Sequence, residues 1–261
     1  MRFIPLYSGS SGNSSLVCAG DTRVLVDAGL TGKAIVSALE CAGEDPAKLS
    51  AIVVTHEHID HIKGVGVLSR KYGVPVYANE ATWRAMAPIV GNIPVRSIRT
   101  FTTGQNFYIG DVDLTPFAIS HDAAEPVGFR LFHKGRSVVC MTDTGVVTDA
   151  CRENARAADL VLMESNHDPV MLKNGPYPYQ LKRRILSEKG HLSNGDAGLT
   201  LVKLYETGVR RAILAHLSRE NNTEQLAAST VRGVLAENGI AEKDYFLTVA
   251  RRGGVTGIFE L

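Results

Sequence analysis

The sequence has no excess of charge of either sign. It contains 28 lysine and arginine residues and 27 aspartate and glutamate residues, which gives a formal net charge of +1 at pH 7. A protein that attracts nucleic acid through its overall charge is strongly basic, and this chain is not. A nucleic-acid partner would therefore have to be bound by a local basic patch.

Cysteine is scarce and shows no regular spacing. The four cysteines are Cys18, Cys41, Cys140 and Cys151, and no two of them form a C-x-x-C pair. Cys140 lies within the apolar run VVCM. The pattern argues against a disulfide framework and against cysteine metal ligands, so we expect buried, reduced thiols.

Long apolar runs are also missing. No stretch is long and apolar enough to span a membrane, and the first residues, MRFIPL, lack the apolar region of a signal peptide. No internal repeat of short period is present. We therefore expect a cytoplasmic protein without a membrane partner, and the sequence does not indicate an oligomeric state.

The most informative stretch is residues 51–61, AIVVTHEHIDH. A β-branched run of strand length ends at three histidines and two acids, and a helix start follows. Side chains alternate along a strand, so His56 and His58 point the same way, while Asp60 and His61 can fold back from the next turn. Imidazoles and carboxylates are ligands for zinc, manganese or iron, and four donors exceed what one catalytic ion needs. The spacing therefore predicts two ions.

This motif, His-x-His-x-Asp-His, resembles the signature of the metallo-β-lactamase fold superfamily. The resemblance implies an α/β fold, namely a four-layer αβ/βα sandwich in which two mixed β-sheets are flanked by helices. The rhythm of the predicted elements is consistent with that arrangement, because both halves are β-rich at first and then alternate strands with helices. With 44% hydrophobic residues, the chain can fill a large core, and we expect residues 1–261 to form a single domain.

Four more apolar strands end on a possible ligand or acid, namely His121, Asp143, Glu164 and His216. In α/β folds, sites form beyond the carboxyl ends of strands, so this shared position is better evidence than any one residue. Single histidines are usually surface or core residues, but a common position at strand ends is harder to explain that way. We expect these side chains to converge on one site.

The resemblance assigns ligands within that set. It implies one metal ion held by His56, His58 and His121, and a second held by Asp60, His61 and His216, with Asp143 bridging. Asp27 and Glu164 would be acids that orient the ligands. Zinc or manganese is expected, with iron possible. Superfamily members that bind two irons for oxygen chemistry replace the second histidine of the motif with glutamate, whereas His58 is kept here, which argues against a redox function.

A pair of divalent ions implies hydrolysis. Two ions at roughly 3.5–4 Å can hold a bridging hydroxide, because the pKa of the bound water falls toward about 7. Asp60 could both bind metal and accept a proton from that water.

Further motifs bear on the substrate. GHLSN at 190–194 resembles the ribonuclease Z motif whose histidine assists phosphodiester cleavage, and AHLS at 215–218 resembles its last metal motif. Together with SGSSGN at 8–13, ESNHD at 164–168 and HLSRENN at 216–222, these motifs resemble the YycJ/WalJ-type branch, bacterial proteins regarded as 5′-to-3′ DNA exonucleases. The resemblance implies a dinuclear metal-dependent phosphodiesterase acting on DNA.

Specific residues follow from this hypothesis. Asp60 and His191 would be catalytic, since a histidine at a helix start can neutralise phosphate charge or transfer a proton. The candidate substrate-binding residues are Asn13, His167 and Asn194 near the metals, and Lys182, Arg183 and Arg184 on a basic helix over 180–189. The alternatives are that His191 caps a helix and that the basic run is a solvated helix face.

Two other classes of function remain open. A small-molecule hydrolase of the thioesterase or lactonase type would use the same metals without a basic helix. A non-enzymatic, metal-dependent regulator would bind metal without turnover, although no expected ligand is missing.

Two local predictions concern segments outside the site. A helix over 80–87, capped by Asn79, should end near Pro88. His133 should be solvent-exposed in the hairpin turn HKGR at 133–136.

Overall fold

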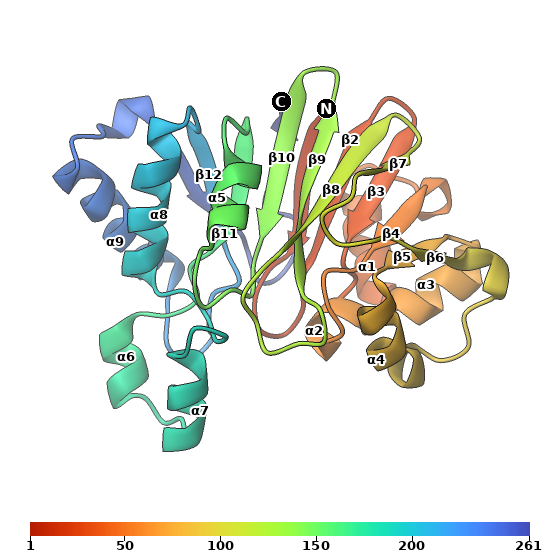
Figure 1. The fold of residues 1–261 in the computed structure, drawn as a ribbon, viewed down its shortest axis with the longest axis horizontal. Helices are drawn as coiled ribbons and strands as arrows, with labels where there is room; N and C mark the ends of the chain where they lie inside the picture. Colours follow the sequence, from red (N-terminus) through yellow and green to blue (C-terminus); the bar gives the residue numbers. More distant parts are fainter.

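Two β-sheets form the centre of the computed structural model, which describes all residues from 1 to 261 (Figure 1). The strands of the first sheet are β1 (Arg2–Tyr7), β2 (Ser14–Ala19), β3 (Thr22–Val26), β4 (Ala51–Val53), β5 (Val76–Ala78), β6 (Ile98–Thr100) and β14 (Phe259–Glu260). Their order is β14-β1-β2-β3-β4-β5-β6. The sheet is mixed, because β3 to β6 run parallel and the other pairs are antiparallel.

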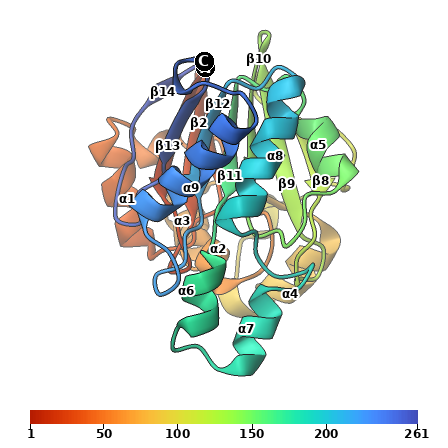
Figure 2. The ribbon, with the colours of Figure 1, turned by 90° about the vertical axis from the view of Figure 1, so that its left-hand side faces the viewer.

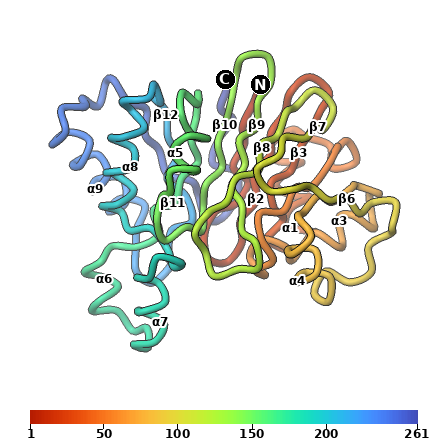
Figure 3. Tube along the Cα trace, viewed as in Figure 1, coloured from red at the N-terminus to blue at the C-terminus, as the bar shows by residue number.

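The second sheet is also mixed and also has seven strands. Its strands are β7 (Phe107–Ile109), β8 (Val112–Ala118), β9 (Val127–His133), β10 (Arg136–Met141), β11 (Leu160–Glu164), β12 (Arg211–Ala215) and β13 (Phe246–Val249). The order is β13-β12-β11-β10-β9-β8-β7, with β10 to β13 parallel and β7 to β10 antiparallel. The chain completes most of the first sheet before it enters the second, and β14 returns to pair with β1 (Figure 3).

Helices cover the outer face of each sheet. On the first sheet these are α1 (Gly32–Cys41), α3 (Val65–Tyr72) and α4 (Glu80–Val90), and on the second α5 (Asp149–Ala155), α8 (Asn194–Glu206) and α9 (Glu224–Glu237). Three short helices, α2 (Ile59–Ile62), α6 (Pro169–Asn174) and α7 (Tyr179–Ile185), lie at one end of the sheets (Figure 2). Single 3-10 turns occur at Pro46–Lys48, Val95–Ser97 and Glu242–Asp244. The layers confirm the predicted αβ/βα sandwich.

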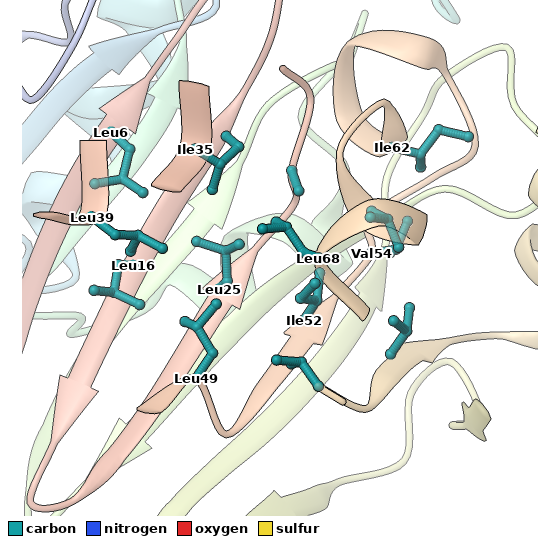
Figure 4. Packing of buried hydrophobic residues seen from close by; sticks show 14 of the residues in the cluster. Leu6, Leu16, Leu25, Ile35, Leu39, Leu49, Ile52, Val54, Ile62 and Leu68 are labelled. Atoms are coloured by element: carbon teal, nitrogen blue, oxygen red, sulfur yellow. The ribbon is translucent and has the colours of Figure 1, made fainter. Parts of the chain in front are cut away.

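Alternation along the strands sorts apolar side chains into three cores. In β1, Ile4 and Leu6 face the helices of the first layer, whereas Phe3 faces the opposite sheet. In β12, Leu214 faces α8 and α9, while Ile213 joins the core between the sheets. This is the two-residue period of a strand buried on both faces. Figure 4 shows the core between the first sheet and its helices.

Side-chain caps fix where several helices begin. At the start of α1, α4, α8 and α9, the side chain of the N-cap residue accepts a hydrogen bond from a backbone N–H of the first turn. The residues are Thr31, Asn79, Ser193 and Thr223, all of preferred N-cap types. The caps satisfy N–H groups that have no partner within the helix. No helix has the length and apolar character needed to cross a lipid bilayer.

Three local predictions are wrong. Helix α4 continues through Pro88 to Val90, because a proline in the last turn removes only one backbone hydrogen bond. His133 is buried, and its Nδ1 donates to the carbonyl of Asp111 at 3.0 Å, because the alternation of β9 turns it inward. Cys41 is exposed at the end of α1, whereas the other three cysteines are buried.

Candidate metal centre

The predicted site residues converge at one end of the two sheets. His56 follows β4 in the first sheet, and His121, Asp143, Glu164 and His216 lie at the carboxyl ends of β8, β10, β11 and β12 in the second. Strands that run parallel end at the same edge, so these chain-distant residues become neighbours. The site therefore lies where the two sheets meet, and α2 adds Asp60 and His61.

Three site residues have left-handed backbone conformations. The φ angles of Asp27, Asp143 and His216 are +60°, +57° and +55°. Aspartate and histidine adopt this region more readily than most residues, but each still costs about 1–3 kcal/mol. Surrounding hydrogen bonds fix the turns: the backbone N–H and hydroxyl of Thr55 donate to the Asp27 carboxylate, each at 2.8 Å. The strain turns these side chains sharply into the site.

The first group of donors is made of histidines. The His56 Nε2 and His58 Nδ1 atoms are 3.1 Å apart, and His121 Nε2 is 3.2 Å from the same His58 atom. In a tetrahedral zinc site with metal–nitrogen distances of about 2.0–2.1 Å, neighbouring ligand atoms lie about 3.3 Å apart. The three nitrogens thus have the spacing of a metal site.

The second group combines two acids and two histidines, and its ligand atoms all lie within 4.8 Å of one another. His61 Nε2 lies 3.2 Å from Asp143 Oδ2, and His216 Nε2 lies 3.4 Å from Asp60 Oδ2. Asp143 also approaches the first group, because its Oδ1 is 3.9 Å from His121 Nε2. This position between the groups is the one expected of a bridging carboxylate.

Two buried atoms in this group have no hydrogen-bond partner, namely Asp143 Oδ2 and His216 Nε2. A buried polar atom without a partner is costly, so such atoms usually mark a missing ion or water. Both atoms are of types that bind divalent metals. The residues present therefore fit metal ions.

Hydrogen bonds orient the imidazole rings. The Nδ1 atom of His61 faces Asp27 Oδ2 at 2.8 Å, that of His121 faces the Gly190 carbonyl at 3.2 Å, and that of His216 faces Glu164 Oε1 at 2.9 Å. An ionised carboxylate or a carbonyl only accepts, so the proton must be on Nδ1 and the Nε2 lone pair is left for a metal. His56 Nδ1 lies 3.0 Å from the Thr55 hydroxyl, which already donates to Asp27 and can therefore accept.

The carboxylates and imidazoles of the site shift one another's pKa values toward the charged forms. Burial raises the pKa of Asp143, but His216 and His61 outweigh it and hold that pKa well below its usual range. Burial lowers the pKa of His216, and Asp143 together with Asp60 and Glu164 outweighs it and raises the pKa to about 10. For Glu164, burial is outweighed by His191 and His216, which lower its pKa to about 2. For His56, burial and the neighbouring His61 lower the pKa well below its usual value.

His191 lies beside both groups without belonging to either. Its Nδ1 is 2.7 Å from Glu164 Oε1, the same atom that holds His216, and 4.0 Å from Asp143 Oδ1. The ring lines a pocket of about 200 Å³ above the donors. The other lining residues outside the metal groups are Ser10, Asn166, Tyr177, Leu181, Arg184, Ile185 and Ser218.

The structure corrects two predicted substrate contacts. His167 is only 1% exposed, and Asn194 is fully buried and hydrogen-bonded to Ser165 and Asn222, so neither reaches the pocket. His167 follows Glu164 and Asn194 follows His191, both of which contact the site. The side chains of His167 and Asn194 themselves point into the protein interior. Asn13 is also buried, and its amide lies 3.3 Å from Asp60 Oδ2 and 3.1 Å from His61 Nε2, so it contacts two of the candidate ligands.

The basic helix is shorter than predicted, and its three basic side chains differ in their partners. Helix α7 covers 179–185, and Gly190 precedes His191 in a tight turn. The Lys182 ammonium donates to the carbonyls of Lys173 and Gly175 within the protein. Arg184 forms an ion pair with Asp122, with Nη2 and Oδ1 at 2.9 Å. Arg183 is exposed and has no carboxylate partner, although it lies 5.9 Å from the ring of Tyr179.

Three residues that shape the site are not among those predicted from the sequence. Thr55 lies inside the histidine motif but gave no signal of its own, and it links Asp27 to His56. Asp122 follows a predicted ligand, and its Oδ1 is 3.5 Å from His121 Nε2. Tyr177 lies in the loop between α6 and α7 and lines the pocket, but no motif marks it in the sequence.

The fold and the donor set define a class of metal-dependent hydrolases. A family model described as the beta-lactamase superfamily domain matches residues 22–217. The chain belongs to this metallo-β-lactamase superfamily.

Relatives narrow the class further. The chain is 44% identical over 246 residues to exodeoxyribonuclease YycJ of Bacillus anthracis, covering 94% of this chain and 93% of that protein. It is also 44% identical over 238 residues to exodeoxyribonuclease WalJ of Streptococcus pneumoniae, covering 90% of this chain and 88% of that one. These identities confirm the resemblance to the YycJ/WalJ-type branch.

Solved structures agree in fold. The metallo-beta-lactamase fold protein YhfI from Bacillus subtilis superimposes with a TM-score of 0.75 at 18% identity, over the full length of both chains. The short form of human tRNase Z gives a TM-score of 0.66 at 17% identity, again covering both chains.

Proposed function

We propose that this protein is a dinuclear, metal-dependent exodeoxyribonuclease that degrades DNA from the 5′ end. The observation that carries the proposal is a pair of donor groups that line an open pocket and approach each other at Asp143 Oδ1 and His121 Nε2, 3.9 Å apart. The names of the relatives with 44% identity support DNA as the substrate. Zinc or manganese is the proposed metal, because imidazole and carboxylate ligands suit both ions.

The metals would be held by two sets of side chains. His56, His58 and His121 would bind one ion, and Asp60, His61 and His216 the other, with Asp143 shared. Two bound divalent ions would supply positive charge for the phosphate and a nucleophilic water ionised near neutral pH. Asp27 and Glu164 keep the donor nitrogens aimed at the site.

The catalytic residues follow from their positions. Asp60 has a carboxylate oxygen next to His61 and His216 and lines the pocket, so it can hold a proton taken from water. His191 lines the same pocket with its Nδ1 fixed by Glu164, which leaves Nε2 to contact a phosphate oxygen or the leaving group. A positioned acid or base of this kind usually contributes about 10²–10⁴ in rate.

The character of the pocket argues against a thioesterase. Of its 13 lining residues only three are hydrophobic, whereas sites for apolar small molecules are mainly apolar. A regulator that binds metal without turnover would have no use for His191, which is placed beside the candidate ligands as a proton-transfer group. The proposed DNA substrate is in keeping with a cytoplasmic location. We also propose that the chain is one domain, because the core between the sheets and the site draw on both halves.

The proposed function can be tested with end-labelled DNA. Linear strands with a 5′ phosphate or a 5′ hydroxyl should release mononucleotides from the 5′ end, and covalently closed circles should stay intact because they have no end. A panel of thioesters and lactones should react far more slowly. Cleavage of circles as fast as linear strands, or faster turnover of a small ester, would contradict an exonuclease.

A second experiment tests the basic helix α7. Replacing Arg183 with glutamine should weaken binding to every DNA sequence alike, because phosphate contacts carry no sequence information. The slope of log affinity against log salt concentration should become shallower by about 0.9 for duplex DNA, or about 0.7 for single strands. The triple variant that also neutralises Lys182 and Arg184 should lose no more than about two such contacts, because the Lys182 ammonium is bonded within the protein.

Arg136 provides a control for this slope. It lies at the start of β10, at the opposite end of the sheet, and pairs with Asp159. Arg136→Gln should leave the salt dependence unchanged. If Arg183→Gln also leaves it unchanged while the nuclease stays active, α7 is a solvated face and the DNA follows another path.

A further inference from the structure

The loop between α6 and α7 places an aromatic ring at the mouth of the metal pocket. Tyr177 is half-buried and lines the pocket together with the metal donors. Pro176 and Pro178 flank it, and proline restricts both its own backbone and that of the preceding residue. Tyr179, two residues later, is 74% exposed and lies outside the pocket. The two tyrosines therefore differ in access to the site.

Contacts from both sides hold this loop in place. The Lys182 Nζ donates to the carbonyl of Lys173 at 2.8 Å and to that of Gly175 at 2.7 Å, which ties the first turn of α7 to the end of α6. Gly175 is packed so closely that an added Cβ would lie 2.6 Å from Asn221 Oδ1. Such a loop presents Tyr177 in a fixed position, which reduces the entropy lost on binding.

The pocket has two different walls above the metal donors. Leu181 and Ile185, at successive turns of α7, continue the apolar surface that begins at Tyr177. Ser10 and Ser218 come from the loops after β1 and β12 and add polar groups. The guanidinium of Arg184, fixed by Asp122, lines the same space. An apolar and aromatic wall combined with a cation and metal donors matches the base and the phosphate of a nucleotide.

We propose that this pocket takes the terminal nucleotide of a single DNA strand, with its base against the ring of Tyr177 and its phosphates toward Arg184 and the metal donors. The inference rests on the proposed function and specifies its substrate. The pocket of about 200 Å³ presents a single aromatic ring, which can stack on one unpaired base. Stacking on an aromatic ring tolerates any base, as an exonuclease without sequence preference requires.

The test compares three variants on single-stranded DNA and on methyl p-nitrophenyl phosphate, a small phosphodiester without a nucleobase. Tyr177→Ala should lower the ratio of kcat/KM for DNA to kcat/KM for the diester by about 10-fold or more, the effect of losing one base-stacking contact. Tyr177→Phe keeps the ring and should restore the ratio. Tyr179→Ala removes an exposed tyrosine nearby and should leave the ratio unchanged.

A modified substrate separates stacking from damage to the loop. On a strand whose terminal nucleotide lacks its base, the wild type and Tyr177→Ala should cleave at the same rate, because the ring has nothing to contact. Lys182→Met, which releases the loop, should lower the ratio on normal DNA and have little further effect in combination with Tyr177→Ala.

The outcomes distinguish failure of the proposed function from failure of the terminal-nucleotide site. A wild type that does not cleave DNA refutes the proposed function itself. A wild type that cleaves DNA with an unchanged ratio in Tyr177→Ala, or with an equal loss on the abasic strand, refutes the terminal-nucleotide site alone. Equal cleavage of blunt duplexes and of single-stranded tails would also refute it.

Discussion

Asp143→Ala should abolish DNA hydrolysis and weaken both metal sites together. The Asp143 carboxylate lies 3.2 Å from His61 Nε2 and 3.9 Å from His121 Nε2, so it serves both donor groups. Losing a bridging ligand removes the charge that positions both ions, and we expect the rate to fall by at least about 10³, the scale of losing a main electrostatic contribution to the transition state. Metal analysis by mass spectrometry and a single-turnover assay would measure the two effects.

Two further variants make this result interpretable. Asp143→Asn retains the shape of the side chain and tolerates the φ of +57°, so it should fold normally and still lose metal. Asp149→Ala removes an exposed aspartate at the start of α5 and should leave metal content and activity unchanged. If Asp143→Ala loses one ion and keeps the other with full affinity, Asp143 does not bridge.

His191→Ala should slow cleavage by about 10²–10⁴ with the metal content intact, because the residue is placed as a proton-transfer group and not as a ligand. Its Nδ1 is engaged by Glu164 at 2.7 Å, and its ring lines the pocket. The rate loss should appear in kcat under saturating DNA, since the interaction is made mainly in the transition state.

His133→Ala is the matched control, because it removes a buried histidine remote from the site. Loss of metal from His191→Ala would contradict the assignment of His191 as a proton-transfer group. The ligand atoms of Asp143, Glu164, His191 and His216 also lie within 4.8 Å of one another, so His191 would then be a ligand and the second metal site would have to be redrawn.

The sequence was most informative where chemistry and strand ends coincide. His56, His58, Asp60 and His61 come from one short motif, and their convergence follows from strand alternation and one turn. The remaining candidate ligands lie at the ends of apolar strands, where a parallel arrangement brings them together. The fold followed from the resemblance and from the order of the elements, and the two sheets and their covering helices confirm it.

The sequence was least informative about side-chain direction in loops. His167 and Asn194 lie in motifs next to true site residues, but the bridge between His167 and Ser193 turns both inward. The loop that carries Tyr177 is held by Lys182, whose charge was predicted from the sequence to contact DNA. Its ammonium instead donates to carbonyls at the end of α6. Tertiary contacts of this kind leave no periodic signal in the sequence.

The most direct test of a dinuclear, metal-dependent nuclease is to titrate metal-stripped protein with zinc or manganese and follow DNA hydrolysis. Activity should be absent without metal and should reach its plateau at two equivalents of metal per chain, because the histidine group and the group of Asp60, His61, Asp143 and His216 lie side by side, with Asp143 Oδ1 3.9 Å from His121 Nε2. A plateau at one equivalent, or full activity in the metal-stripped protein, would contradict the account.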